Sequence, residues 1–175
     1  TGPYAARPGY DALVQAMGGV MSLTGDPAGE PMKIGVSIAD LMSGMYAGVS
    51  ILAAVNHQRN TGKGQHIDIS MLDTHVAWLA NQGMNYLATG EIPERLGNNH
   101  PNIVPYQVMP SADGYFVLSV GNDPTFERFC EVAGCQNLLE DARFNKAVER
   151  VRNRDHVTET LNEITRQHPS AWWLE

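Results

Sequence analysis

The chain has 175 residues, of which 43% are hydrophobic and 18% charged, so it can bury a sizeable core in one ordinary domain or two small ones. Its 19 acidic side chains outnumber its 12 lysines and arginines and give a formal net charge of −7. This balance argues against a nucleic-acid-binding or membrane-surface protein, because both classes bind their anionic partners through clustered Lys and Arg side chains.

The first 35 residues are rich in Gly and Pro and predict loops around one short helix. We expect that helix near Tyr10 to Met17, where the pair Gly18-Gly19 ends it. The sequence of residues 26–29 (DPAG) is typical of a turn.

A long helix is predicted from about Ile38 to Arg59. Its large apolar residues recur at helical spacing, and Gly, Ala and Ser occupy much of the rest; the recurring residues are Leu41, Met45, Val49, Leu52 and Val55. Two glycines inside one helix are costly and indicate a packing reason. No apolar run approaches the roughly 20 residues of a membrane span, and we therefore expect no membrane contact.

Asp40 lies in the first turn of this helix, and no other charged residue follows until Arg59. Ser37 is a good N-cap, and Asp40 three residues later completes a pattern typical of a capping box. A lone carboxylate there can be a cap, a partner for a basic group, or a nucleophile that attacks an activated acyl group. Spacing alone favours the cap.

Residues 60–64 (NTGKG) end the long helix, either as a plain tight turn or as a loop whose N–H groups and lysine bind an anion. The alternation in His66–Met71 predicts a strand. A second helix is expected from about Leu72 to Ala88.

Residues 90–106 form a polar link, and the change in composition places a domain boundary at about residue 92. Within it, residues 97–102 (GNNHPN) are either a mobile lid or a solvated linker. Beyond the link we predict a hairpin of Tyr106–Met109 and Tyr115–Val120, joined at an Asp-Gly turn.

The pair Asp123-Pro124 opens a helix with proline at its first position, and a final charged helix is expected from about Asn145 to Gln167. The two cysteines, Cys130 and Cys135, are too few for a disulfide scaffold, and we expect reduced thiols. The six histidines are scattered without a metal-ligand spacing, so we expect no metal site. The last residues, 170–175, look like the start of a further element, and we expect a fragment of a longer protein.

Several motifs together resemble the family III CoA-transferases, which include formyl-CoA transferase, the carnitine and bile-acid CoA-transferases and α-methylacyl-CoA racemase. The most specific stretch is residues 61–73 (TGKGQHIDISMLD). The other matching stretches are residues 1–11 (TGPYAARPGYD), the Asp40 helix, and the motifs VPYQ, ADGY and VGND at 104–107, 112–115 and 120–123.

The resemblance implies an α/β fold in which this chain supplies the helical part that follows a Rossmann-like segment and then the start of a small α+β domain. Residues 1–91 would be the incomplete C-terminal part of the large CoA-binding domain, and residues 92–175 an incomplete small domain. Members of the family are interlaced homodimers that use CoA and acyl-CoA as substrates, with a carboxylic acid as acceptor and no tightly bound cofactor.

The resemblance also assigns roles to residues. Asp40 matches the family's nucleophilic aspartate, which carries the acyl group as a mixed anhydride and then CoA as an aspartyl thioester. Tyr10 matches a tyrosine of the CoA site, so Arg7, Pro8, Gly9 and Tyr10 should border CoA. The racemases have a histidine at the position of Tyr10, and a phenol is a poor proton acceptor at neutral pH, so transferase is favoured over the alternative of an acyl-CoA racemase.

By this resemblance, residues 98–103 correspond to the glycine-rich lid of formyl-CoA transferase, but they have no glycine run. This departure argues against a matching lid and against formyl or oxalate as the acyl group. Because the Rossmann-like half lies outside this chain, we expect the isolated piece to be inactive. The family implies a cytoplasmic protein or, in a eukaryote, one of the mitochondrial matrix.

Overall fold

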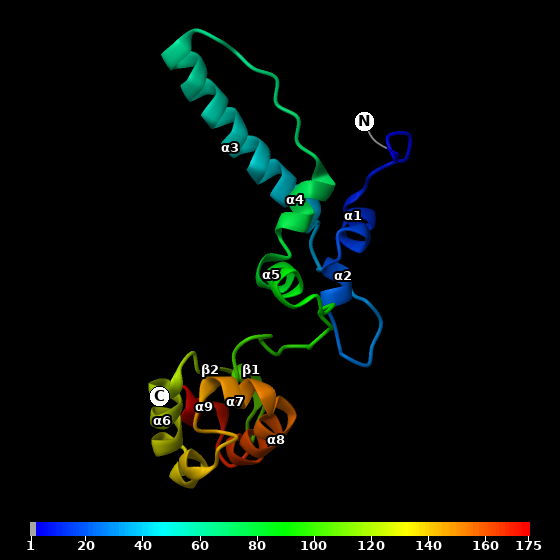
Figure 1. Cartoon of the computed structure of the whole chain (residues 1–175). Helices are drawn as coiled ribbons and strands as arrows, with labels where there is room; N and C mark the ends of the chain where they lie inside the picture. The colour runs from blue at the N-terminus through cyan, green and yellow to red at the C-terminus, as the bar shows by residue number, and fades with distance from the viewer. Residues whose placement is uncertain (1–2) are drawn as a thin grey trace. The chain divides into compact units, whose positions relative to one another are not determined.

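The computed structural model describes residues 3–175, which form two compact units (Figure 1). The N-terminal unit ends at Gly97, and the C-terminal unit is Asn98–Glu175. The sequence placed the boundary near residue 92, but the following residues are bonded to the first unit. Arg95 donates from Nε to the carbonyl of Asp26 at 3.1 Å and from Nη2 to that of Gly29 at 2.9 Å.

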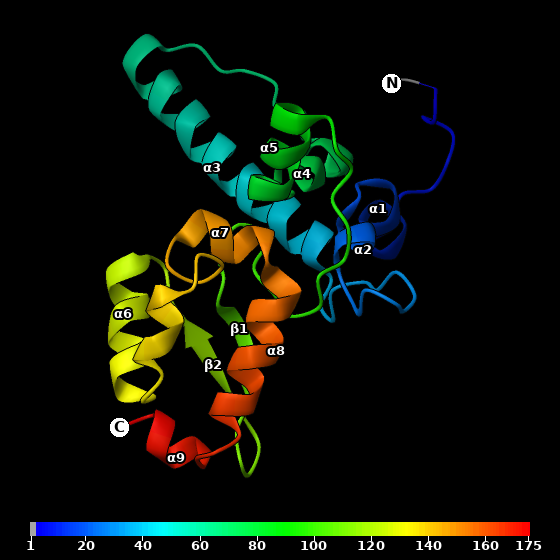
Figure 2. The same cartoon turned by 60° about the horizontal axis from the view of Figure 1, so that its bottom comes forward.

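The N-terminal unit consists of helices, as far as the described residues show. They are α1 (Asp11–Met17), α2 (Val20–Leu23), α3 (Ile38–Thr61), α4 (Met71–Ala77) and α5 (Ala80–Thr89). Helices α1 and α4 pack against α3, and Figures 1 and 2 both show the rest of α3 extending away from them. The segment 62–70 returns alongside α3 to the start of α4.

Helices α1 and α3 confirm the predicted helices at these positions. Gly62 ends α3 with φ at +74°, a conformation that glycine adopts without strain, and its N–H donates to the Gln58 carbonyl at 2.7 Å. The N–H of Lys63 donates to Thr61 Oγ1 at 3.2 Å. These bonds show how residues 61–64 end α3.

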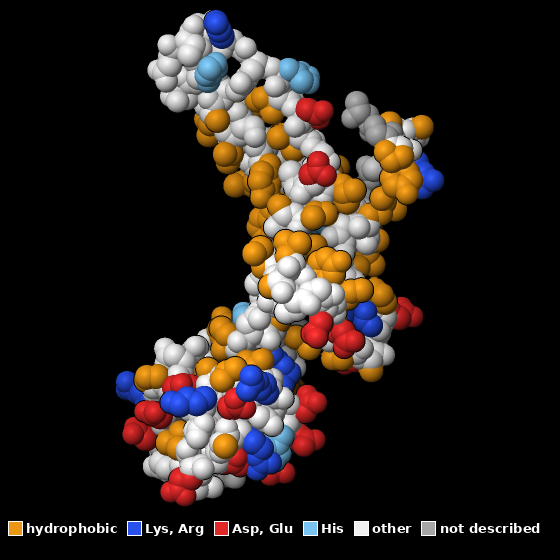
Figure 3. Space-filling view, viewed as in Figure 1, with side chains coloured by type: hydrophobic (Ala, Val, Ile, Leu, Met, Phe, Trp, Pro, Cys, Tyr) orange, Lys and Arg blue, Asp and Glu red, His pale blue; other side chains and the backbone are white. Residues whose placement is uncertain are grey.

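Most of α3 is exposed, and Ala39 is its one buried residue. The exposed side chains include large apolar ones, such as Met45 and Val49 at 64% and Leu52 at 71%. A Cβ on Gly44 or Gly48 would meet nothing within 4 Å, so neither glycine has a packing partner among the described residues. Figure 3 shows the apolar side chains gathered over the N-terminal unit and the charged ones over the C-terminal unit.

The expectation that no stretch approaches a membrane span was wrong for α3. Its 24 residues include an 18-residue window of mean hydropathy 1.6, which is long and apolar enough to cross a membrane by length and composition. The interleaved Gly, Ala and Ser residues hide this run when only large side chains are considered. Core helices of soluble proteins meet the same criterion, so α3 alone does not identify a membrane protein.

Two further expectations in this unit were wrong. Residues 66–70 form no strand, because no described segment pairs with them. The helix expected over Leu72–Ala88 is divided into α4 and α5 at Trp78–Leu79, and Ala80 takes a positive φ of 47° at the break. No Gly or Pro stands at this break to signal it.

The C-terminal unit is built on the predicted hairpin. Strands β1 (Tyr106–Pro110) and β2 (Tyr115–Ser119) pair antiparallel, with Val108 opposite Val117. Around them lie α6 (Asp123–Val132), the 3₁₀ helix η1 (Gln136–Glu140), α7 (Ala147–Arg152), α8 (Arg154–Thr165) and α9 (Ser170–Trp173). Figure 2 shows the hairpin between α6 and α8.

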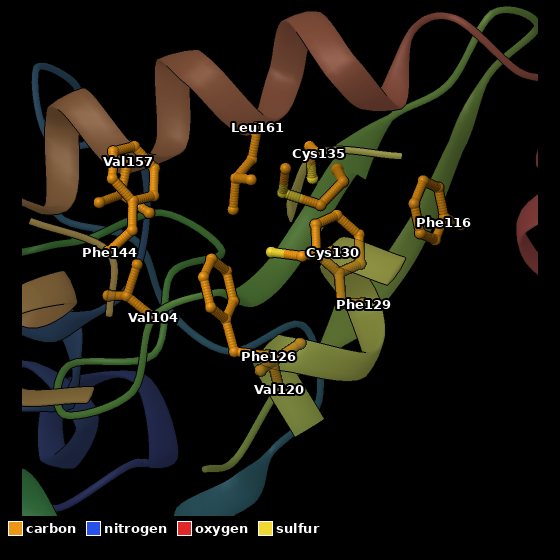
Figure 4. Packing of buried hydrophobic residues seen from close by; sticks show 11 residues of the cluster. Val104, Phe116, Val120, Phe126, Phe129, Cys130, Cys135, Phe144, Val157 and Leu161 are labelled. Atoms are coloured by element: carbon orange, nitrogen blue, oxygen red, sulfur yellow. The ribbon is translucent and has the colours of Figure 1, made fainter. Parts of the chain in front are cut away.

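The core of this unit joins the hairpin to α6 and α8 (Figure 4). Met109 and Leu161 are fully buried in it, and the free thiols Cys130 and Cys135 are buried there too. Trp173 covers one side, because its ring stacks on Phe116 at a centroid distance of 5.5 Å and its Nε1 donates to the Thr165 carbonyl at 2.9 Å. The aromatic end of the chain thus packs on the hairpin.

The charged helix expected over Asn145–Gln167 is two helices that meet at Asn153, and one of its charges is buried. Arg150 is 1% exposed and donates to the carbonyls of Val104 at 2.9 Å and Phe144 at 2.8 Å. It also donates to Asp123 Oδ1 at 3.0 Å. This guanidinium therefore ties three segments of the C-terminal unit together.

Candidate active site

Asp40 lies in the first turn of α3 with an exposed side chain. Within residues 3–175 its carboxylate makes no hydrogen bond and no ion pair. Ser37 occupies the N-cap position but makes no side-chain capping bond. Two of the three roles that the sequence left open, the cap and the partner of a basic group, are therefore not filled by Asp40 among the described residues.

The cap of α3 comes instead from α1. Asp11 Oδ1 accepts the backbone N–H of Ala39 at 2.8 Å, and Asp11 Oδ2 accepts from Gln15 Nε2 at 2.7 Å. A carboxylate at this end also interacts favourably with the helix dipole. The residue that satisfies the helix N-terminus is thus 28 positions before Ala39 in the sequence.

Gln15 holds the segment of chain that leads into α3. Its side chain is fully buried, and its Oε1 accepts the N–H of Ile34 at 2.8 Å. Its Nε2 also lies 3.4 Å from the carbonyl of Val36. Asp11 and Gln15, one turn apart on α1, therefore fix residues 34–39 directly before Asp40.

Helix α4 is bonded to α3 one turn beyond Asp40. Ser43 Oγ lies 3.0 Å from Thr74 Oγ1 and donates to the Ala39 carbonyl at 2.7 Å. The next residue, His75, is 1% exposed, and neither ring nitrogen has a partner among the described residues. Burial lowers the pKa of His75, while the charge of Asp11 acts in the opposite direction.

Three of the four residues expected to border CoA line a groove of about 250 Å³. The groove lies between the segment before α1, α1 itself and the start of α4, and its lining is mostly apolar: Tyr4, Arg7, Pro8, Gly9, Leu13, Val14, Met17, Met71 and Leu72. The Arg7 guanidinium lies 4.4 Å from the centre of the Tyr4 ring. Tyr10 is not part of this lining, and its side chain is 72% exposed.

The polar tract after Gly97 belongs to the C-terminal unit and is tied to it. Arg154 Nη2 donates to the Pro101 carbonyl at 2.7 Å, and the His100 N–H donates to the Tyr106 carbonyl at 3.0 Å. The N–H of Asn102 donates to His100 Nδ1 at 3.1 Å. Among residues 3–175 no group of three His, Cys, Asp or Glu side chains could hold a metal ion.

Sequence reasoning missed the two polar residues of α1 that support Asp40. The available signal was their i, i+4 spacing on a short helix, which places both side chains on one face. Nothing in the sequence indicates that this face meets the start of α3.

Comparison with known proteins places this arrangement in a family. The sequence model of CoA-transferase family III matches residues 1–175. The chain is 48% identical over 165 residues to the succinate–glutarate CoA-transferase of Agrobacterium fabrum, covering 94% of this chain and 41% of that protein. It is 40% identical to the acetyl-CoA:oxalate CoA-transferase of Acetobacter aceti, covering 100% of this chain and 45% of that protein.

Comparison with solved structures finds a similar fold. A CaiB/BaiF family protein from Brucella suis superposes with a TM-score of 0.78 at 48% identity, covering 99% of this chain and 46% of the other. The chain therefore spans less than half the length of the proteins that it matches.

Proposed function

The chain belongs to CoA-transferase family III, and from this we propose that the full-length protein that contains it moves CoA between two carboxylic acids, with Asp40 as nucleophile. The observation that supports the assignment most directly is that Asp11, and not Asp40, accepts the hydrogen bond at the start of α3. Asp11 provides the cap, and the Asp40 carboxylate is left exposed, with no bond to any of the residues that the structure describes.

The proposed reaction needs no proton transfer and no resident cofactor. An Asp40 oxygen attacks the thioester carbonyl of the donor, the C–S bond breaks, and CoA leaves as a thiolate while a mixed anhydride forms. The thiolate then attacks the Asp40 carbonyl of that anhydride, which releases the first acid as a carboxylate and leaves an aspartyl-CoA thioester.

The second half reverses these steps with the acceptor. The acceptor carboxylate attacks the aspartyl thioester carbonyl, expels CoA thiolate and forms a new anhydride. The thiolate attacks the acceptor's acyl carbon, and the new acyl-CoA leaves with Asp40 free as a carboxylate. Each step exchanges one acyl bond for another, so atoms and charges balance.

The acids are proposed to be dicarboxylates of the size of succinate and glutarate. The Agrobacterium relative is named for succinate and glutarate, and the human and mouse relatives, each 36% identical, are named succinyl-CoA:glutarate CoA-transferases. CoA would lie along the groove that Arg7, Pro8 and Gly9 line, with Tyr10 beside it. We further propose an interlaced homodimer, whose second subunit or missing half would cover the exposed face of α3.

The test uses the full-length protein with succinyl-CoA and glutarate. The aspartyl thioester is converted by hydroxylamine to a hydroxamate, and mass spectrometry should map it to Asp40. Asp40→Ala should abolish both adduct and turnover, whereas Asp155→Ala, which removes another exposed first-turn carboxylate from α8, should retain both. An adduct on another residue, or undiminished turnover of Asp40→Ala, would refute the assignment.

A further inference from the structure

We propose that Asp11 and Gln15 are positioning residues for the nucleophile: they hold the start of α3 so that the Asp40 carboxylate stays free for the acyl group. The inference rests on the proposed function, because it assigns a supporting role to two residues of α1 that act on Asp40 through the backbone. Neither residue is expected to touch the substrate.

The backbone N–H groups at the start of α3 need acceptors from outside the helix. The first N–H groups of a helix have no partner within the helix. Here Ile38 N–H donates to the Val36 carbonyl at 2.8 Å, and Ala39 N–H donates to Asp11 Oδ1 at 2.8 Å. Without Asp11 the N–H of Ala39, a residue with no exposed surface, would lack this acceptor.

If Asp11 were absent, the unpaired N–H of Ala39 would attract another side-chain oxygen. A side-chain oxygen near a helix N-terminus is drawn to unpaired N–H groups, as N-cap preferences show. Ser37 and Asp40 are the oxygen-bearing side chains on either side of Ala39. If Asp40 turned back to the helix end, its oxygens would be hydrogen-bonded and less available for attack.

Gln15 holds both Asp11 and the segment before α3 in place. Gln15 is fully buried and uses both ends of its amide, with Oε1 accepting from Ile34 N–H and Nε2 donating to Asp11 Oδ2. The bond from Gln15 fixes the orientation of the Asp11 carboxylate, and the bond from Ile34 fixes the segment that enters α3. A shift of about 1 Å at a reacting group can cost on the order of 100-fold in rate, so such support bears on turnover.

The experiment compares variants of the full-length protein in succinyl-CoA:glutarate exchange. Asp11→Ala should lower kcat by about tenfold or more while KM for acyl-CoA changes less than about threefold, because the substrate contacts remain. Asp11→Asn keeps an acceptor for Ala39 N–H and should recover a substantial part of kcat. Formation of the Asp40 adduct should slow in parallel with kcat.

The matched control is Asp113→Ala. Asp113 Oδ1 accepts the N–H of Ser170 at 2.7 Å, so it too caps a helix, α9, that is remote in sequence. Its removal should cost stability and leave kcat unchanged. Thermal unfolding of each variant separates lost stability from lost turnover.

The outcomes are decisive in both directions. The proposal is overturned if Asp11→Ala turns over within about twofold of wild type, if its loss lies in KM, or if Asp113→Ala loses as much kcat. Should Asp11→Ala not fold, Asp11→Glu decides: it retains charge and acceptor but displaces the oxygen, and wild-type kcat for it overturns the proposal. Failure of the nucleophile assignment shows separately, as turnover in Asp40→Ala.

Discussion

Replacing Arg150 with methionine should destabilise the C-terminal unit severely. Methionine keeps much of the length of the side chain but removes every donor. The carbonyls of Val104 and Phe144, both on residues 1% exposed, then lose their partner. Each buried acceptor left unpaired costs about 1–3 kcal/mol.

The loss of the ion pair with Asp123 lowers the free energy of unfolding by less than the loss of a fully buried pair would. The Asp123 side chain is 29% exposed, and its Oδ1 retains the N–H of Ala147 at 2.7 Å. The contact of the guanidinium with the Phe126 ring, at 4.4 Å, is also lost. The total is about 3–5 kcal/mol, the range measured when one partner of a buried pair is removed.

This magnitude is large against the total stability of a domain, about 5–15 kcal/mol. For a domain of 60–100 residues each kcal/mol shifts Tm by about 4–8 °C, so a decrease of more than about 12 °C is expected. Arg152→Met is the control, because Arg152 is 68% exposed and makes one bond of 2.6 Å to Glu149. That surface pair should contribute less than about 1 kcal/mol.

The assay is urea unfolding followed by tryptophan fluorescence in a Trp78→Phe background. The remaining tryptophans, Trp172 and Trp173, then report on the C-terminal unit alone. If Arg150→Met unfolds at the same urea concentration as Arg152→Met, the reasoning that these buried acceptors depend on Arg150 is refuted.

Three further predictions concern the N-terminal unit and the substrate. Burial holds the pKa of His75 below its ordinary value near 6.5, so the unfolded state binds the proton more readily and stability should fall as pH drops below about 6.5. In urea titrations, the free energy of unfolding should depend less on pH in His75→Phe than in the wild type, whereas the exposed control His57→Gln should behave as the wild type does. The same pH dependence in His75→Phe and the wild type would contradict this. The isolated chain should self-associate through exposed α3 and bind CoA weakly at most. Leu52→Glu should lower the mass of the associated species measured by light scattering. A wild-type monomer that binds CoA tightly in calorimetry would refute both expectations. In the full-length protein, Tyr10→Phe should keep most of kcat and raise KM for acyl-CoA, whereas loss of substrate α-hydrogen exchange with deuterated water in this variant would favour the racemase alternative.

Local signals predicted the elements whose ends are set by neighbouring residues. Helix α6 has Asn122 as N-cap, bonded to the N–H of Thr125 at 2.9 Å, with proline in its first turn. The β1–β2 hairpin follows from its alternation and its Asp-Gly turn. In these cases every determinant lies within a few residues of the feature, so the sequence is sufficient.

Elements that depend on distant partners could not be predicted in this way. The alternation of residues 66–70 is compatible with a strand, but a strand also needs a neighbour to pair with. The charge of Arg150 fits a solvated helix face until Val104 and Phe144 bring their carbonyls to it. Asp40 and residues 7–9 are proposed as site residues from the family resemblance, because spacing alone favours a cap at Asp40.

The caps of three helices show why spacing misled at Asp40. The N–H groups of Ala39, Ala147 and Ser170, at the starts of α3, α7 and α9, are accepted by carboxylates 28, 24 and 57 positions away: Asp11, Asp123 and Asp113. A capping box assumes that the acceptor lies within the same turn. When the acceptor comes from another element, the helix end is satisfied by tertiary structure, and a carboxylate in its first turn is released from that role. At α3 the Asp40 carboxylate is left without a bond among the described residues, and in the proposed mechanism the docking of α1 is the condition for its availability.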